Sequence, residues 1–138
     1  MPDASDIPAR STPIRVVLCD DVPALRTLMS AVLTEHPDIE VVGEAADGGA
    51  VVELVRDLRP DVVLLDLAMP AVDGLQATPR ILAASPNTQV VGLSGFATEQ
   101  VGEQMLAAGA VAYLEKGVDL EIVVGTVLRL GPAAPPAA

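Results

Sequence analysis

The sequence predicts an α/β protein with a single, doubly wound, five-stranded parallel sheet. Short apolar runs rich in β-branched residues alternate along the chain with segments in which apolar residues recur three or four positions apart. Five strands that alternate with five helices predict right-handed crossovers and helices on both faces of the sheet. The length of 138 residues and the hydrophobic share of 51% suffice for one buried core.

The strand predictions rest on runs of Val, Leu and Ile. They cover residues 14–20, 39–45, 61–66, 88–94 and 110–115. The run at 61–66 is apolar between its two aspartates, which is typical of a strand buried on both faces.

The helix predictions rest on amphipathic spacing. They cover about 22–33, 51–58, 74–84, 98–108 and 120–128, and the first ends before His36 and Pro37. Pro79 lies inside the third helix, where proline removes a backbone donor and clashes with the preceding turn. We therefore expect the third helix to be kinked or to start late.

The two ends of the chain differ in composition from the rest. Residues 1–13 and 131–138 are rich in Pro, Ala and Ser and show no periodicity, so we expect flexible tails around a domain at 14–130. The C-terminal segment is equally compatible with the start of a linker. The sequence leaves two possibilities open: a single-domain protein, or one domain of a longer protein that continues beyond residue 138.

Charge and composition argue against several functional classes. The formal net charge of −11 repels the phosphates of nucleic acids, and the two aromatic residues, Phe96 and Tyr113, cannot provide a base-stacking surface. Cys19, the single cysteine, lies in an apolar run and is interpreted as a buried hydrophobe. No signal peptide or membrane-spanning run is recognisable, so we expect a cytoplasmic protein that binds neither nucleic acid nor membrane directly.

Charged and hydroxyl side chains gather at the predicted carboxyl ends of the strands. Asp20 and Asp21 follow the first strand, Asp66 ends the third, Ser94 ends the fourth and Lys116 follows the fifth. The carboxyl ends of parallel strands form the edge where α/β sheets bind ligands. Carboxylates gathered there repel one another unless a cation neutralises them, and an all-oxygen site without His or Cys suits Mg²⁺ better than Zn²⁺.

These residues suit the transfer of a phosphoryl group. Lys116 is the only lysine in the chain, and its ammonium can pair with a carboxylate or with a phosphoryl oxygen. The hydroxyl of Ser94 can donate to a phosphoryl oxygen, and the following Gly95 permits close approach of the backbone. Structural roles remain as alternatives: helix capping or turn formation for Asp20, Asp21 and Ser94, and a solvated loop charge for Lys116.

With these residues in place, the chain resembles the receiver domains of bacterial two-component response regulators over residues 14–130. The segment DVVLLDLAMPAVDGL at 61–75 carries the strongest resemblance. It implies that Asp66 is the phosphoacceptor and that the residues after it shape the loop into the next helix, namely Met69, Pro70, Asp73 and Gly74. The resemblance also implies the flavodoxin-like strand order 2-1-3-4-5.

The resemblance extends to the other site residues. It implies a Mg²⁺ site formed by Asp20, Asp21, Asp66 and the backbone carbonyl of Ala68. It further implies that Ser94 and Lys116 bind the phosphoryl group. Tyr113 matches the aromatic switch residue of the family, which changes from exposed to buried when the hydroxyl residue of the fourth strand moves toward the phosphoryl group. A buried aromatic residue without a switching role is the alternative for Tyr113.

Two features depart from the common pattern of the family. Gly117 follows the lysine where many receivers have proline, a variation familiar among receivers coupled to helix-turn-helix outputs. Ala68 and Phe96 occupy positions that resemble those governing the access of water to the phosphoacceptor, which leaves the lifetime of the phosphoryl group open.

The resemblance implies a signalling switch and not an enzyme. We expect Asp66 to take a phosphoryl group from a histidine kinase or a phosphotransfer protein, and a surface formed by the fourth helix, fifth strand and fifth helix to change. Ile122 and Leu130, outside the main apolar stripe of the last helix, suggest a homodimer or partner surface. Two alternatives differ in class: a degenerate receiver that binds partners without phosphorylation, and a haloacid-dehalogenase-like phosphatase, which needs a second acid where this chain has Ala68.

Overall fold

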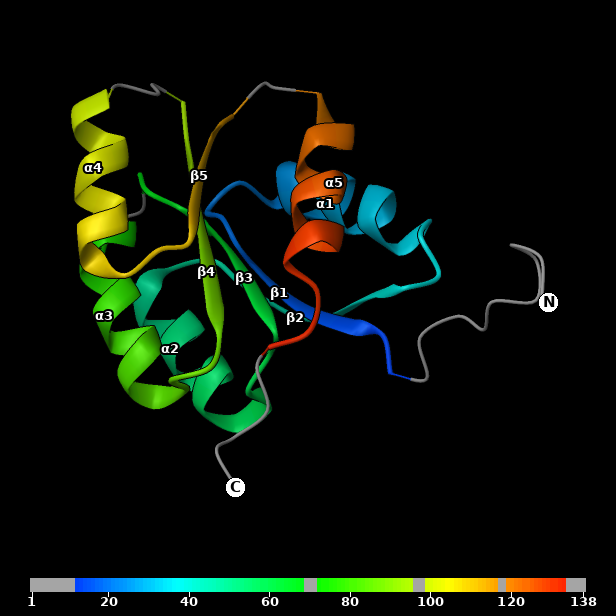
Figure 1. The fold of residues 1–138 in the computed structure, drawn as a ribbon, viewed down its shortest axis with the longest axis horizontal. Coiled ribbons are helices and arrows are strands. Elements are labelled where there is room, and N and C mark those ends of the chain that lie inside the picture. Colours follow the sequence, from blue (N-terminus) through cyan, green and yellow to red (C-terminus); the bar gives the residue numbers. More distant parts are fainter. Residues whose placement is uncertain (1–11, 69–71, 96–98, 117–118, 134–138) are drawn as a thin grey trace, which may run out of the picture.

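In the computed structural model, which describes residues 12–68, 72–95, 99–116 and 119–133, the chain forms a five-stranded parallel sheet with a helix after each strand (Figure 1). The elements are β1 (Ile14–Cys19), α1 (Pro23–Thr34), β2 (Ile39–Ala45), α2 (Gly48–Leu58), β3 (Val62–Asp66), α3 (Gly74–Ala84), β4 (Gln89–Ser94), α4 (Glu99–Ala108), β5 (Ala112–Glu115) and α5 (Leu120–Leu130). The strand order is β2-β1-β3-β4-β5. The predicted fold class and strand order are therefore confirmed.

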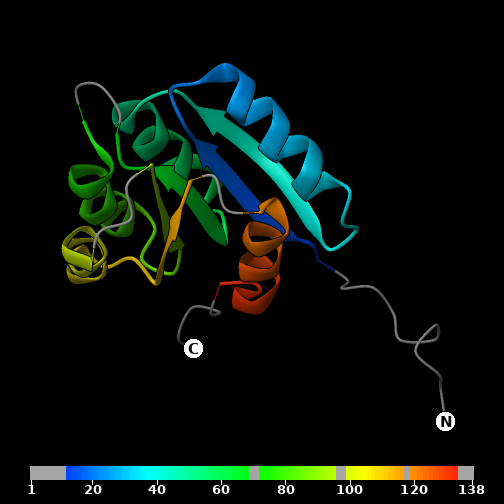
Figure 2. The ribbon, with the colours of Figure 1, turned by 90° about the horizontal axis from the view of Figure 1, so that it is seen from above.

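Apolar cores lie on both faces of the sheet. Helices α1 and α5 cover one face, and α2, α3 and α4 cover the other (Figures 1 and 2). Successive side chains of a strand point to opposite faces, so Val16 joins the core under α1 and α5, whereas Val17 joins the core under α2, α3 and α4. Strand β3 is buried along its whole length, which places Asp66 at the end of the central strand. No helix within the described ranges has the length and apolar character to span a bilayer.

The third helix has the bounds expected from its spacing, 74–84, and of the two effects expected of Pro79 the late start does not occur. Helix α3 runs from Gly74 to Ala84 with Pro79 inside it. The helix start is fixed before the proline by a capping box: Asp73 Oδ1 accepts a hydrogen bond from Gln76 N at 2.8 Å, and Gln76 Oε1 accepts one from Asp73 N at 3.2 Å. Two reciprocal hydrogen bonds at the N-terminus thus outweigh the one backbone donor that Pro79 lacks.

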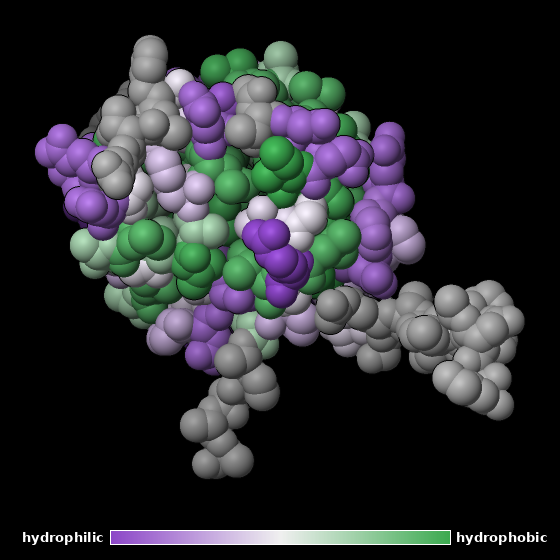
Figure 3. Space-filling view, turned by 45° about the horizontal axis from the view of Figure 1, so that its top comes forward, coloured by the Kyte–Doolittle hydropathy of each residue, from purple (hydrophilic) through white to green (hydrophobic). Residues whose placement is uncertain are grey.

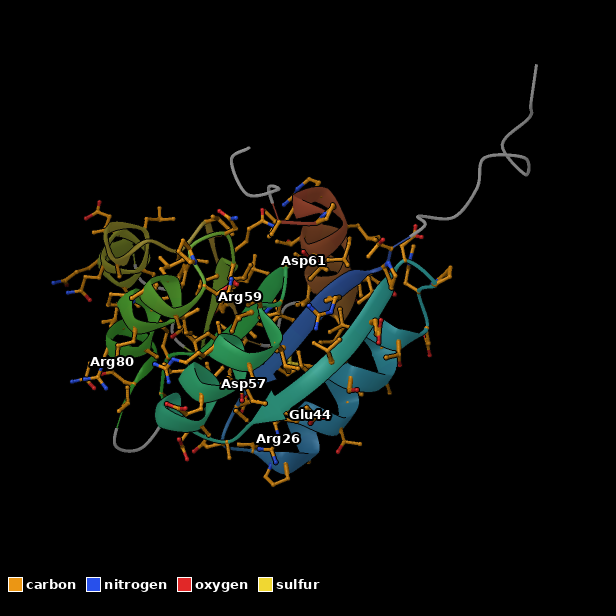
Figure 4. The ribbon with its side chains drawn as sticks, turned by 90° about the horizontal axis from the view of Figure 1, so that it is seen from below. Arg26, Glu44, Asp57, Arg59, Asp61 and Arg80 are labelled. Atoms are coloured by element: carbon orange, nitrogen blue, oxygen red, sulfur yellow. The ribbon has the colours of Figure 1, made fainter. Side chains whose placement is uncertain are left out.

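The chain segment after α5 is held against the amino ends of the strands. Gly131, with φ of 66°, turns the chain, and its carbonyl accepts a hydrogen bond from Gln89 Nε2 at 3.1 Å. Ala133 N donates to Asp61 Oδ1 at 2.9 Å, while Asp61 Oδ2 accepts from Arg15 N at 2.8 Å. Asp61, directly before β3, is labelled in Figure 4. We call the hydrogen bonds from Gln89 to Gly131 and from Ala133 to Asp61 the C-terminal clasp; residues 134–138 and 1–11 of the predicted tails lie outside the described part.

The clasp can be tested by removing one backbone donor. Ala133→Pro loses the N–H that Asp61 Oδ1 accepts, and we expect the free energy of unfolding to fall by about 1 kcal/mol. Ala133→Gly keeps the N–H and serves as the matched control. Urea denaturation followed by circular dichroism measures both, and equal stability of the two variants would contradict the clasp.

Candidate functional site

Two buried carboxylates and one ammonium group meet at the carboxyl end of the sheet. Asp20, which follows β1, is 3% exposed, and Asp66, which ends β3, is 1% exposed. Lys116 Nζ lies 2.9 Å from Asp20 Oδ2 and 2.9 Å from Asp66 Oδ2. The three residues that sequence analysis placed at the carboxyl ends of strands therefore meet at one site, where Lys116 contacts both aspartates.

Backbone N–H groups orient the two carboxylates. Asp20 Oδ1 accepts a hydrogen bond from Val22 N at 2.8 Å, and Asp66 Oδ1 accepts one from Ala68 N at 3.1 Å. Apart from the ammonium of Lys116, no donor in the described part of the chain reaches either Oδ2 atom. Each carboxylate therefore uses one oxygen to shape its own loop and directs the other into the site.

The ionisation of these groups reflects their burial and their mutual contacts. Burial raises the pKa of Asp66 above its ordinary value, and the hydrogen bonds from Lys116 and Ala68 offset this only in part. Burial alone would lower the pKa of Lys116, but its hydrogen bonds to Asp20 and Asp66 raise the pKa above its ordinary value. The lysine is thus held as an ammonium ion, and one positive charge faces two carboxylates.

Asp21 adds a third acid at the same edge. One carboxylate oxygen from each of Asp20, Asp21 and Asp66 lies within 4.8 Å of the others, and Asp21 is exposed to solvent. Three carboxylate oxygens at one edge, with the exposed Asp21 beside two buried acids, match the hard oxygen ligands and retained waters that Mg²⁺ prefers. The donor set fits a magnesium ion, in agreement with the residue types in the sequence.

Ser94 and Lys116 are joined through the backbone. Lys116 N donates a hydrogen bond to the carbonyl of Ser94 at 2.6 Å, so the end of β4 is tied to the residue that contacts both aspartates. The register pairs Ser94 with Glu115 and Gly92 with Tyr113. Tyr113 is half-buried and packs against the core under α2, α3 and α4.

The loop after Asp66 depends on a glycine at the start of α3. A Cβ atom on Gly74 would lie 2.6 Å from Leu67 Cδ2 and 2.8 Å from the Asp66 carbonyl oxygen, distances that real Cβ atoms do not adopt. Gly74 N also donates to the Leu67 carbonyl at 3.2 Å. Gly74 and the helix cap Asp73 thus fix the start of α3 after this loop, and their expected role in shaping the loop stays a prediction. Other residues expected at the site lie outside the described part: Met69, Pro70, Phe96 and Gly117.

Sequence analysis missed one residue next to the acids. Arg26, on the first turn of α1, donates from Nη1 to the Asp20 carbonyl at 2.6 Å, and its Nε lies 3.5 Å from Glu44 Oε1 (Figure 4). Its position six residues after Asp20 and inside an amphipathic helix resembles that of an ordinary surface arginine. The interaction depends on the direction of the chain between β1 and α1, which the spacing of apolar residues in the sequence does not reveal.

Cys19 is buried, in agreement with its interpretation from sequence. The residue is 2% exposed, and burial, followed by the charges of Asp47, Asp66 and Asp20, raises the pKa of its thiol to about 12. A thiol of this kind stays protonated at neutral pH and is a poor nucleophile.

The surface over α5 combines apolar and charged groups. Figure 3 shows a broad area of hydrophobic side chains over this helix, bordered by hydrophilic ones. Ile122 is 50% exposed, whereas Leu130 is partly buried. The expected homodimer or partner surface on the last helix stays a prediction.

Known proteins are similar to this chain in sequence and fold. A family model of the response regulator receiver domain matches residues 16–127. The chain is 42% identical over 103 residues to the uncharacterized transcriptional regulatory protein YxjL of Bacillus subtilis, a match that covers 75% of this chain and 47% of YxjL. It is also 42% identical over 107 residues to protein-glutamate methylesterase/protein-glutamine glutaminase 3 of Myxococcus xanthus, covering 75% of this chain and 30% of that protein. The chain thus spans less than half the length of these relatives.

The structural comparison agrees with the sequence comparison. The signal receiver domain of the putative response regulator NarL from Mycobacterium tuberculosis superposes with a TM-score of 0.81 at 35% sequence identity, covering 86% of this chain and 95% of that domain. The receiver resemblance seen in the sequence is thereby confirmed. The fold, the family match over most of the chain and these relatives show that the chain belongs to the response regulator receiver domain family of two-component systems.

Proposed function

We propose that this receiver takes a phosphoryl group from a histidine kinase or a phosphotransfer protein onto Asp66, with Mg²⁺ bound by the neighbouring acids. The observation that carries the proposal is the contact of one ammonium group, that of Lys116, with the buried carboxylates of both Asp20 and Asp66. This arrangement offers a carboxylate nucleophile, a cation for phosphoryl oxygens and an acidic site for metal. Each part is needed for phosphoryl transfer to a carboxylate.

The transfer step follows from the positions of these groups. A carboxylate oxygen of Asp66 forms a bond to phosphorus, while the phosphorus–nitrogen bond of the phosphohistidine breaks and its electron pair returns to the imidazole. Lys116 pairs with the phosphoryl oxygens and offsets their negative charge. Asp20, Asp21, Asp66 and the Ala68 carbonyl would hold Mg²⁺, which would supply further positive charge beside the phosphoryl oxygens.

The conformational response involves Ser94 and Tyr113. We propose that the Ser94 hydroxyl moves toward the phosphoryl group and that Tyr113 changes its exposure with it, which alters the surface of α4, β5 and α5. The backbone bond between Lys116 and Ser94 supports such a coupling. A homodimer through the exposed Ile122 of α5 is compatible with this response, and the net charge of −11 argues against direct binding of nucleic acid.

The alternatives receive less support from the geometry. A degenerate receiver would not need Asp20, Asp66 and Lys116 in contact, yet these residues share one site. A haloacid-dehalogenase-like phosphatase would need a second acid at the position of the exposed Ala68. We therefore retain phosphorylation of Asp66 as the proposal.

Phosphorylation is tested directly by mass. Incubation of the chain with Mg²⁺ and acetyl phosphate should add the mass of one phosphoryl group in intact mass spectrometry. Asp66→Asn should abolish the addition, because the amide lacks the carboxylate oxygen that attacks phosphorus. Asp57→Asn, which removes an exposed acid on α2 (Figure 4), is the matched control and should be phosphorylated normally. Full modification of Asp66→Asn would show that the acceptor is another residue.

Magnesium binding should stabilise the folded chain. At a Mg²⁺ concentration ten times the dissociation constant, we expect a gain of about 1.4 kcal/mol in the free energy of unfolding. Asp21→Asn removes an exposed ligand and should lose most of this gain without lowering the stability of the metal-free protein. Denaturation with and without Mg²⁺ at constant ionic strength measures the effect, and an unchanged gain in Asp21→Asn would remove Asp21 from the site.

Lys116 should also be needed for stability without metal. Lys116→Met leaves two buried carboxylates facing each other, and we expect a loss of about 3–5 kcal/mol at pH 7. Without the ammonium the pKa of Asp66 rises further, so the folded variant binds a proton more tightly than the unfolded chain. Its deficit relative to wild type should therefore shrink as the pH falls toward about 5. Lys116→Arg keeps the charge as a control, and a pH-independent deficit in Lys116→Met would contradict this account.

A further inference from the structure

The ring of Tyr113 lies between two glycines. A Cβ atom on Gly102 of α4 would lie 3.2 Å from Tyr113 Cδ1 and 3.6 Å from Cε1. A Cβ atom on Gly92 of β4 would lie 3.5 Å from Tyr113 Cδ2, on the other side of the ring. We call this arrangement the glycine slot. The helix and the strand can both approach the ring closely because neither glycine carries a side chain.

The strand side of the slot has little room to move. Gly92 is hydrogen-bonded into the sheet between β3 and β5, where it pairs with Leu65 and Tyr113. Met105, which is fully buried, occupies the space next to it, since a Cβ on Gly92 would lie 2.6 Å from Met105 Cε. A methyl group added at Gly102 therefore cannot be accommodated by a shift of β4. Either the ring of Tyr113 or helix α4 must move instead.

Another helical glycine provides the comparison that isolates this contact. Gly125, inside α5, would place a Cβ in open space, with nothing within 4 Å. A glycine inside a helix costs about 0.5–1 kcal/mol relative to alanine. Gly102 and Gly125 share this cost, and they differ in that the Gly102 position faces an aromatic ring. The effect of alanine at the two positions thus separates helix propensity from the contact with Tyr113.

We propose that Gly102 is a positioning residue for Tyr113: its missing side chain holds the slot open, and so sets how much of the time the ring occupies the place between α4 and β4. This inference rests on the proposed function in one respect, that Tyr113 takes part in the response to phosphorylation. Alanine at position 102 should disfavour the ring position seen here and shift the population toward a ring outside the slot.

The chain itself offers a specific probe. It contains one tyrosine and no tryptophan, so tyrosine emission reports on Tyr113 alone. In the unphosphorylated, metal-free protein, Gly102→Ala should increase quenching of this emission by acrylamide about twofold. This corresponds to about a twofold increase in the population with the ring outside the slot. Gly125→Ala should leave quenching unchanged and raise the free energy of unfolding by up to about 1 kcal/mol.

A double-mutant cycle separates the ring contact from other effects. In a Tyr113→Ala background, Gly102→Ala should stabilise the protein as much as Gly125→Ala does, whereas in the wild-type background it should stabilise less or destabilise. If Gly102→Ala unfolds the protein, recovery of folding by Tyr113→Ala supports the same contact. Wild-type quenching in Gly102→Ala, or equal stabilisation in both backgrounds, would overturn the proposal.

Failure of the inference and failure of the proposed function give different results. Acetyl phosphate with Mg²⁺ should change the tyrosine emission of wild type, and the size of the change should differ in Gly102→Ala because the population with the ring in the slot already differs before phosphorylation. If mass spectrometry finds no phosphorylation of wild type, the proposed function fails while the quenching result still decides on the slot. If both proteins are phosphorylated with the same emission change, the role of Gly102 is refuted and the proposed function stands.

Discussion

Two buried carboxylates share one ammonium group at the carboxyl end of the sheet, and the arrangement of the surrounding elements depends on this contact. Asp20 and Asp66 end neighbouring strands of a parallel sheet, so their like charges are forced together by the fold. Lys116 reaches both from beyond β5, two strands away from β3. The site is therefore not a local sequence motif. Its two negative charges come from the ends of β1 and β3 in the middle of the sheet, and its positive charge comes from Lys116 after the edge strand β5.

Strand β4 links the contacts of Lys116 with Asp20 and Asp66 to the ring of Tyr113, which packs on the face of the sheet covered by α2, α3 and α4. Its last residue, Ser94, accepts the backbone hydrogen bond of Lys116, and Gly92, two residues earlier, lies against Tyr113. Both contacts belong to one short, regular strand, and Ser94 and Gly92 are only two residues apart. A displacement of the end of β4 is therefore close enough to act on the ring of Tyr113.

Much of this site was predictable because a parallel sheet brings strand ends together regardless of their separation in sequence. Asp20, Asp66 and Lys116 were identified in this way, and the alternation of strands and helices gave the fold class. The interaction of Arg26 with the Asp20 carbonyl was not predictable, since it joins a side chain to the backbone through the path of a loop. The bounds of α3 were predictable from its apolar spacing, but the late start that Pro79 suggested as an alternative was not borne out, because the capping box of Asp73 and Gln76 fixes the start of the helix.

The C-terminal clasp has a practical consequence for the design of fusion proteins. Asp61 and Gln89 fix Gly131 and Ala133 at the edge of the sheet opposite to Asp66. A fluorescent reporter or affinity label joined beyond this point would depart from the far side of the molecule, leaving the acidic edge open to a kinase. Labels intended to sense the ring of Tyr113 would need a different point of attachment, on the exposed side of α4.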